Sequence, residues 1–267
     1  MVNTNDNQTA GALDVAHLKQ IAELVYKRNA ELVKLDKMKD EFVALASHEL
    51  RTPLTIIKNY LWLATHQKNE PLGPSTAKSV EIALHTADRL MFLVEDILTI
   101  SRIENGRINL VPEDSDIISF AQDIIEEYNV KAQERKISIT FNPSIPSQTV
   151  KIDRNRFHQV VVNLLGNAIK FTPDNGSISI TTAKPTPTTF ALQITDTGPG
   201  ISKEHQDKLF TKFGKIDESY ANLPNVNGTG LGLYISQEIM KLHGGSISVE
   251  SDYGHGATFI VSLPISE

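Results

Sequence analysis

His48 is the strongest candidate for a catalytic nucleophile in this sequence. It lies in the run Ser47-His48-Glu49-Leu50-Arg51-Thr52-Pro53. A neutral imidazole carries one unprotonated nitrogen near neutral pH and can act as a nucleophile. Glu49 can accept the proton of the other nitrogen. Pro53 removes the backbone donor that would bond the carbonyl of Glu49, so the helix should soften after the histidine. The alternative is that this histidine, on a helix beside a glutamate, is an ordinary surface residue.

Two amides form a second candidate site. Asn163 and Asn167 lie one helical turn apart in VVNLLGNAIKFTP, an otherwise apolar segment. A buried amide without a partner costs about 1–3 kcal/mol, so both predict partners. Either they cap a neighbouring loop, or their oxygens bind a Mg²⁺ ion that holds phosphate oxygens. In the second case Lys170 would bring a cation close to the phosphates.

Two glycine-rich segments form the third candidate. Asp196-Thr197-Gly198-Pro199-Gly200 follows an expected strand, and Gly228-Thr229-Gly230-Leu231-Gly232 opens an expected helix. Glycines before a helix let backbone N–H groups approach phosphate, although each segment alone is also typical of a simple turn. The sequence has no G-x-x-x-x-G-K-[ST] and no early strand–GxGxxG–helix unit, which argues against Walker A and dinucleotide-binding folds. The polar stretch 201–227 between the segments predicts a functional lid without regular structure.

Apolar periodicity predicts that the N-terminal part is a helical hairpin. A seam at three- and four-residue spacing predicts one helix, and a second seam predicts another, with a Pro/Gly turn at 69–75 between them. These seams are Val43, Ala46, Leu50, Leu54, Ile57, Leu61 and Ala64, then Val80, Leu84, Ala87, Met91, Val94 and Leu98. One hairpin cannot bury faces this broad, so we expect two copies to pair as a four-helix bundle. The alternative is that the hairpin packs only on its own C-terminal domain.

The pattern after residue 112 predicts a mixture of strands and helices. Helices are expected at 117–133, 157–171 and 232–242, and strands at 136–141, 177–182, 190–195, 246–250 and 257–263. This order favours an α/β layer with the helices on one face.

Composition excludes several classes of protein. The chain of 267 residues has a formal net charge of −6, which does not fit a nucleic-acid footprint. It has no cysteine, which excludes disulfide frameworks and Cys-based metal sites. No apolar run reaches the roughly 18 residues of a membrane span, and the first residues are polar, unlike a signal peptide. We expect a cytoplasmic protein, or the cytoplasmic portion of a membrane-bound sensor.

In this order, the motifs resemble those of sensor histidine kinases of two-component signalling, over about residues 36–267. FVALASHELRTPLT resembles the H box, 163–171 the N box, DTGPGI the G1 box, LFTKFGKID the F box, GTGLGL the G2 box and SDYGHGATF the final glycine motif. The resemblance implies an α+β fold class: a HisKA-type hairpin in a dimeric four-helix bundle, then an α/β sandwich (Bergerat-type) ATP-binding domain. It also implies three segments, a signalling helix or linker (1–36), a dimerisation and phosphotransfer domain (37–108) and a catalytic ATP-binding domain (109–267).

The resemblance further implies the site. Asn167 would coordinate Mg²⁺ with Asn163 beside it, and Asp196 would accept the exocyclic amine of adenine. The residues that would line or shape the nucleotide pocket are Lys170, Phe171, Gly198, Gly200, Gly228, Thr229, Gly230, Leu231 and Gly232, with Thr258 near the base. Relatives often carry arginines and a second aromatic in the F box, where this chain has Lys212, Gly214 and Lys215. Lys215 can neutralise phosphate, but a lysine cannot form a bidentate fork.

The activity implied is ATP- and Mg²⁺-dependent autophosphorylation of His48, followed by transfer to an aspartate in the receiver domain of a response regulator. The Glu-x-x-Thr pattern of Glu49 and Thr52 further implies dephosphorylation of that regulator. The partners are then a second copy of the chain and a response regulator, and not nucleic acid. Two alternatives remain at this point. A conformational ATPase of the gyrase and chaperone type would carry a glutamate at the position of Asn163, and a non-catalytic dimeric scaffold would have lost its nucleotide pocket.

Overall fold

The computed structural model describes residues 6–66, 72–214 and 229–265, and in the first half of α1 many side chains lie outside this description. The chain divides into two compact units, Met1–Ser101 and Arg102–Glu267. Each unit is described by itself below.

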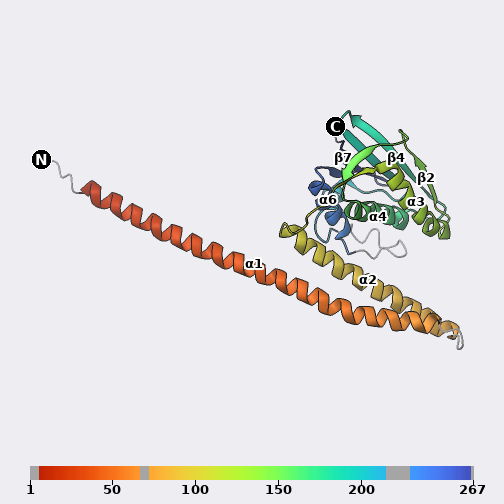
Figure 1. Ribbon diagram of the computed structural model, residues 1–267, viewed down its shortest axis with the longest axis horizontal. Helices are drawn as coiled ribbons and strands as arrows, with labels where there is room; N and C mark the ends of the chain where they lie inside the picture. The colour runs from red at the N-terminus through yellow and green to blue at the C-terminus, as the bar shows by residue number, and fades with distance from the viewer. Residues whose placement is uncertain (1–5, 67–71, 215–228, 266–267) are drawn as a thin grey trace. The chain divides into compact units, whose positions relative to one another are not determined.

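The N-terminal unit is a helical hairpin (Figure 1). Helix α1 spans Asp6–His66 and continues through Pro53, and helix α2 spans Pro74–Glu104, with its last turn counted in the second unit. Ion pairs between described residues join the helices. Arg51 pairs with Glu95, and Lys58 Nζ lies 2.6 Å from Asp88 Oδ1. Because the later residue of α1 pairs with the earlier residue of α2, the helices run antiparallel, as the sequence predicts.

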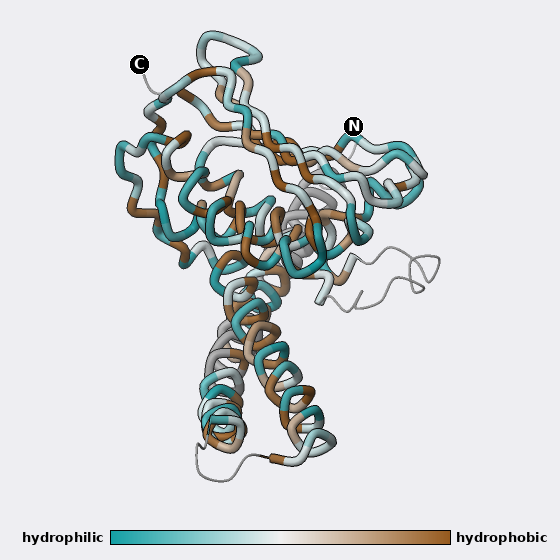
Figure 2. Tube along the Cα trace, turned by 90° about the vertical axis from the view of Figure 1, so that its right-hand side faces the viewer, coloured by the Kyte–Doolittle hydropathy of each residue, from teal (hydrophilic) through white to brown (hydrophobic). Residues whose placement is uncertain are grey.

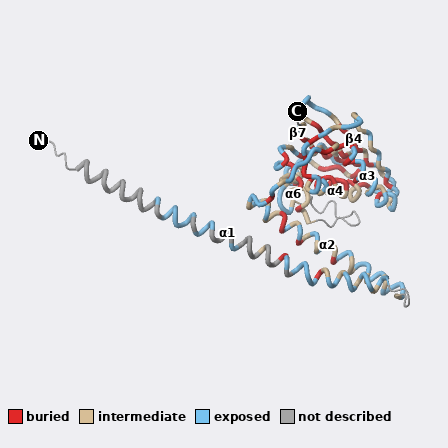
Figure 3. The backbone as a smooth tube through the Cα atoms, viewed as in Figure 1, coloured by how far each residue is buried: buried red, intermediate tan, exposed pale blue. Residues whose placement is uncertain are grey.

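The hairpin buries only part of its apolar surface within one chain. Leu54, Ala87, Val94 and Leu98 are buried. A second apolar row stays exposed, comprising Leu50, Ile57, Leu90 and Ile97 with exposed fractions of 49%, 50%, 40% and 36%. Figure 2 shows hydrophobic residues along both helices, and in Figure 3 the positions of the hairpin whose burial is described are mostly exposed or half-buried. None of the helices in the described ranges combines the length and hydropathy needed to cross a bilayer.

The C-terminal unit is an α/β layer. Its elements in order are β1 (Glu113–Asp116), α3 (Ile117–Glu134), β2 (Ser138–Asn142), β3 (Thr149–Ile152), α4 (Arg154–Phe171), β4 (Ser177–Thr186), β5 (Thr189–Asp196), α5 (Lys203–Gln206), α6 (Gly232–Leu242), β6 (Ser246–Ser251) and β7 (Ala257–Pro264). The main sheet has the order β2-β4-β5-β7-β6, with β2 parallel to β4 and the other pairs antiparallel. Strands β1 and β3 form a separate antiparallel pair. Helices α3, α4 and α6 cover one face of the main sheet (Figure 1).

Strand alternation builds the core of this unit. Buried residues alternate with half-buried ones over 178–183 of β4 and 257–263 of β7. The same alternation runs through β5 from Phe190 to Asp196, except that Ala191 is also buried. The largest apolar side chains on the buried face of these strands are Ile178, Ile180, Phe190, Leu192, Ile194, Phe259, Val261 and Leu263. Helix α4 lies against β5 and helix α6 against β7. The apolar side of α4 contributes Phe157, Val160, Leu164 and Leu165 to this core. The core therefore fixes α4, the helix of the two amides, against β5, the strand that ends in Asp196.

The predicted elements agree with this architecture, with three omissions. The short strands β1 and β3 carry no long apolar alternation, and the sequence did not predict them. Helix α5 lies inside the stretch predicted to lack structure, so that prediction is wrong for Lys203–Gln206. Residues 215–228 of the same stretch lie outside the described residues.

Candidate nucleotide and phosphoacceptor sites

Asp196 is a buried carboxylate at the end of a central strand. It closes β5 and its exposed fraction is 5%. The backbone N–H of Gly198 donates to Asp196 Oδ1 over 2.7 Å, and the N–H of Ala257 is a second donor. Burial raises the pKa of this carboxyl above its ordinary value, and the two backbone hydrogen bonds oppose that rise. A buried acceptor of this kind suits a ligand that brings an N–H donor.

Asn163 joins α4 to α6. Its Nδ2 donates to Ser236 Oγ over 2.9 Å, and Ser236 is almost fully buried. A Cβ at Gly232 would clash with Asn163 Oδ1, so the glycine allows the start of α6 to approach α4 closely. The sequence predicts a hydrogen-bond partner for the Asn163 amide, and that partner is Ser236 of the neighbouring helix.

Asn167, one turn later on α4, has a different environment. Its amide is half-buried, and it makes no hydrogen bond with any residue that the structure describes. Lys170 and Phe171 follow on the last turn, where Lys170 Nζ lies 4.8 Å from the centre of the Phe171 ring. The side-chain oxygen of Asn167 could bind a Mg²⁺ ion, and Lys170 could bind the phosphate that the ion holds.

Arg135 fixes the end of α4, a role that no pattern in the sequence predicts. Its guanidinium donates to the carbonyl oxygens of Ile169 (2.6 Å) and Thr172 (2.9 Å) and pairs with Asp174, 2.8 Å from Oδ1. It thereby satisfies carbonyl groups that the helix leaves without a partner at its C-terminus. Phe171 is held in place between these contacts.

The second glycine segment opens α6 as predicted. The Thr229 hydroxyl accepts a hydrogen bond from the N–H of Leu231 over 3.2 Å, and Leu231 is fully buried. Tyr234 stands on the first turn, and Lys212 Nζ lies 5.4 Å from its ring centre. Lys212 also pairs with Glu104, which belongs to the same C-terminal unit. Lys212, the one of the two F-box lysines that the structure describes, therefore lies close to the start of α6.

Thr258 requires a correction. In the pairing of β5 with β7, Asp196 lies opposite Ala257, and Thr195 lies opposite Thr258. Successive side chains of a strand point to opposite faces, so Thr258 faces away from Asp196. Its hydroxyl bonds to that of Thr195 over 2.9 Å. The residue beside Asp196 on the buried face is Ala257.

His48 lies on the surface of α1. It is exposed, while the preceding Ser47 is buried. The Thr52 hydroxyl, one turn later, donates to the backbone carbonyl of His48 over 3.3 Å. The imidazole is therefore accessible to a reactant from solvent.

Three predicted site positions lie outside the described residues. They are Lys215, Gly228 and the side chain of Glu49.

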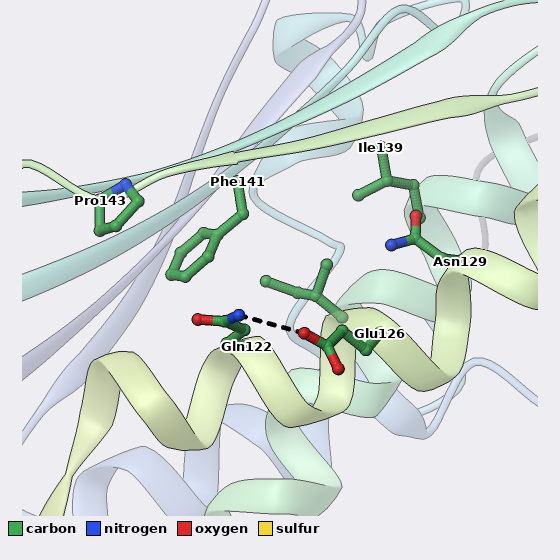
Figure 4. Close-up of a pocket in the computed structure, with 7 residues that line it drawn as sticks. Gln122, Glu126, Asn129, Ile139, Phe141 and Pro143 are labelled. Atoms are coloured by element: carbon green, nitrogen blue, oxygen red, sulfur yellow. Dashed lines mark hydrogen bonds between the residues drawn. The ribbon is translucent and has the colours of Figure 1, made fainter.

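A groove in the C-terminal unit lies apart from these residues (Figure 4). It has a volume of about 270 Å³ and lies between α3 and the edge strand β2, lined by Gln122, Ile125, Glu126, Asn129, Ile139, Phe141 and Pro143. In it Gln122 donates to Glu126 over 3.1 Å. No lining residue is a cation or belongs to α4, β5 or α6, so the groove does not fit a phosphate ligand.

Two family models match the chain. The model described as "His Kinase A (phospho-acceptor) domain" matches residues 38–106, and the model described as "Histidine kinase-, DNA gyrase B-, and HSP90-like ATPase" matches residues 152–267. With the site geometry above, they define the class: the chain belongs to the family of two-component sensor histidine kinases.

Two curated relatives are similar to most of the chain. Sensor protein SrrB of Staphylococcus aureus is 35% identical over 234 residues, which are 87% of this chain and 39% of SrrB. The non-motile and phage-resistance protein of Caulobacter vibrioides is 34% identical over 256 residues, 92% of this chain and 30% of that protein. The chain thus spans about a third of the length of these curated relatives.

Solved structures agree with the fold. Full-length ShkA in complex with AMPPNP matches with a TM-score of 0.70 and 29% identity, covering 85% of this chain and 46% of that one. Histidine kinase ThkA in complex with the response regulator protein TrrA matches with a TM-score of 0.58 and 27% identity, covering 85% of this chain and 61% of that one.

Proposed function

We propose that this chain is the kinase portion of a sensor, which uses ATP to phosphorylate His48 and passes the phosphoryl group to an aspartate of a response-regulator receiver domain. The observation that carries the proposal is that one chain holds an exposed histidine in a matched phosphoacceptor domain and a buried aspartate, Asp196, in a matched ATPase domain. The related structures with a nucleotide analogue and with a response regulator support the same sequence of events.

In the nucleotide site, the residues take separate roles. Asp196 accepts the exocyclic amine of adenine, because its buried carboxylate gains a donor that water does not supply there. Gly198, Gly200 and Phe171 shape the adenine pocket, and the backbone from Thr229 to Gly232 borders the phosphates at the start of α6. Lys170 brings a positive charge close to them.

Asn167 would hold Mg²⁺. Its half-buried amide without a described hydrogen-bond partner fits an oxygen ligand, whereas the amide of Asn163 is bonded to Ser236. When bound, Mg²⁺ supplies charge neutralisation between the phosphates. The chain's own contribution is to keep the Asn167 oxygen oriented by the packed helix α4.

In the transfer step, an imidazole nitrogen of His48 uses its lone pair to attack the γ-phosphorus in line. The new N–P bond forms as the bond between the γ-phosphorus and the bridging oxygen breaks, and ADP leaves with that electron pair. The proton on the other imidazole nitrogen passes to Glu49 or water. Catalysis is mainly positioning and charge neutralisation.

We propose three segments for this chemistry: a signalling helix or linker (1–36), a dimerisation and phosphotransfer domain (37–108) and an ATP-binding domain (109–267). The exposed row of Leu50, Ile57, Leu90 and Ile97 supports pairing of two hairpins into a four-helix bundle. We assign the kinase portion to the cytoplasm, where ATP and receiver domains are found.

Labelling with γ-labelled ATP tests the kinase activity. We expect label on the protein that is lost in acid and retained in base, as a phosphoramidate requires. His48→Ala should abolish it. The matched control is His85→Ala, at an exposed histidine of α2, which should label like the parent chain. Acid-stable label would contradict the proposal, and sustained phosphate release without phosphoprotein would favour a conformational ATPase.

We also propose that the chain dephosphorylates its response regulator, with Thr52 positioning the attacking water. Thr52 is exposed one turn from His48, where its hydroxyl can reach a docked receiver domain. Thr52→Ala should spare autophosphorylation and slow dephosphorylation of the phosphorylated regulator by about tenfold or more. Thr55→Ala, on the same helix with its hydroxyl bonded to the carbonyl of Arg51, is the control. Equal loss of both activities in Thr52→Ala would refute the assignment.

A further inference from the structure

The loop that follows Asp196 lies against the connection between β6 and β7. Gly200 has φ +68°, and a Cβ there would clash with the carbonyl oxygen of Asp252. The N–H of Gly254 donates to the carbonyl of Pro199 over 2.6 Å. This loop, Gly198–Ile201, is thus packed directly on a part of the chain fifty residues further on.

Ser251, the last residue of β6, both accepts and donates a hydrogen bond where this loop meets the β6–β7 connection. Its Oγ accepts the N–H of Ile201 over 2.8 Å and donates to the carbonyl of Gly256 over 2.6 Å. Gly256 directly precedes Ala257, which pairs with Asp196 in the sheet. One side chain therefore links the far end of the loop to the strand that flanks the carboxylate.

Gln206, the last residue of α5, completes the arrangement. Its Nε2 donates to the carbonyl oxygens of Ile201 and Ser251, each over 2.8 Å. Both protons of the amide are used, and both backbone groups of Ile201 are satisfied by side chains instead of by a strand or helix. Ile201 has an exposed fraction of 7%. Removing either side chain leaves a buried backbone group of Ile201 without its partner.

We propose that Gln206 and Ser251 are positioning residues for the nucleotide: together they hold the loop Gly198–Ile201 in the conformation that binds adenine. This inference rests on the proposed function of the Asp196 pocket. The loop begins with the Gly198 N–H that bonds Asp196, so its conformation sets where the carboxylate points. A loop already ordered in the free protein does not have to be ordered when the ligand binds, which raises affinity.

Nucleotide titration calorimetry on the full chain, carried out in the His48→Ala background with ADP and Mg²⁺, measures this effect without phosphorylation. We expect Ser251→Ala and Gln206→Met each to weaken ADP binding by about three- to tenfold. The number of binding sites per folded chain should stay unchanged. Ser251→Thr keeps the hydroxyl on a strand residue and should restore the affinity. Gln122→Met, which changes a glutamine on the surface of α3, is the matched control and should bind like the parent.

The outcomes separate positioning from a merely structural role. Loss of folded protein would lower the number of sites and leave the dissociation constant of the remaining fraction unchanged, which would overturn the inference. Unchanged affinity in both Ser251→Ala and Gln206→Met would also overturn it. If Ser251→Ala fails to fold, Gln206→Met decides alone. Absence of ADP binding by the parent chain would instead contradict the proposed function, so the two failures are distinguishable.

Discussion

At the scale of single residues, Asp196 illustrates how function and stability oppose each other. Its carboxylate is buried, and its pKa is raised by that burial although two backbone hydrogen bonds act to lower it. Burial thus disfavours the charged form that the proposed function requires. A site that keeps a carboxylate under these conditions gives up stability for a directed acceptor.

The pH dependence of Asp196 follows with a definite sign. Its pKa is raised from the ordinary value of 3.8, so its contribution to the free energy of unfolding is fully present below that pH and is lost as the pH rises through the raised folded value. Asp196→Asn removes this titration. It should keep the fold, be at least as stable as the parent chain near neutral pH, and lose ATP binding about a hundredfold or more, since a donor then faces the adenine amine.

Chemical denaturation at acidic and neutral pH, together with nucleotide titration, checks this prediction. A variant that binds ATP like the parent would remove Asp196 from the adenine site. Asp123→Asn, at an exposed carboxylate on α3 of the same unit, serves as the control.

At the scale of elements, the nucleotide site depends on the packing of α4 against α6. The hydrogen bond from the half-buried Asn163 to the buried Ser236 joins the two helices. At the start of α4, Asp153 accepts the N–H groups of Val111 and Arg156. Although burial acts to raise it, the pKa of Asp153 is lowered by these hydrogen bonds and by the nearby charge of Arg156. Helix α4 is therefore anchored at its beginning, middle and end.

Ser236→Ala should destabilise the C-terminal unit by about 1–3 kcal/mol, because the Asn163 amide loses its buried partner. Scanning calorimetry of the transition of that unit measures the loss. Ser79→Ala, on the exposed surface of α2, should change the unfolding of the chain by less than about 0.5 kcal/mol. A Ser236→Ala variant as stable as the parent would show that α4 and α6 are held by apolar packing alone.

The sequence predicted most elements because apolar periodicity directly reflects which face of each is buried. It predicted α6 with its observed bounds and α4 to within three residues, since both pack an apolar stripe on the sheet. The placement of Thr258 was wrong because strand register, which decides the face, follows from pairing with β5 and not from the motif. Arg135, Ser236, Gln206 and Ser251 were missed because single polar residues carry no periodic signal. Ser236 follows Gly232 by four residues, so both lie on the same face of α6, which is turned to Asn163. This spacing is the feature of the sequence from which the role of Ser236 could have been predicted.

At the scale of the whole molecule, the exposed apolar rows of the hairpin define the expected assembly. Leu90→Glu combined with Ile97→Glu places two charges in the row that would face a second copy. Sedimentation should show a monomer in place of a dimer, since buried charges without partners are costly. ADP affinity should stay within twofold, because the nucleotide residues belong to the other unit.

Lys78→Glu, a charge change at an exposed polar position of α2, should leave the dimer intact. A parent chain that sediments as a monomer at micromolar concentration would contradict the proposed bundle.

The most direct test of the central claim is to locate the phosphoryl group after incubation with ATP and Mg²⁺, by mass spectrometry of peptides prepared at alkaline pH. We expect one phosphorylated residue, His48, and no phosphorylation when Asp196→Asn abolishes nucleotide binding. Phosphate on any other residue, or on His48 at the parent level in the Asp196→Asn chain, would contradict it.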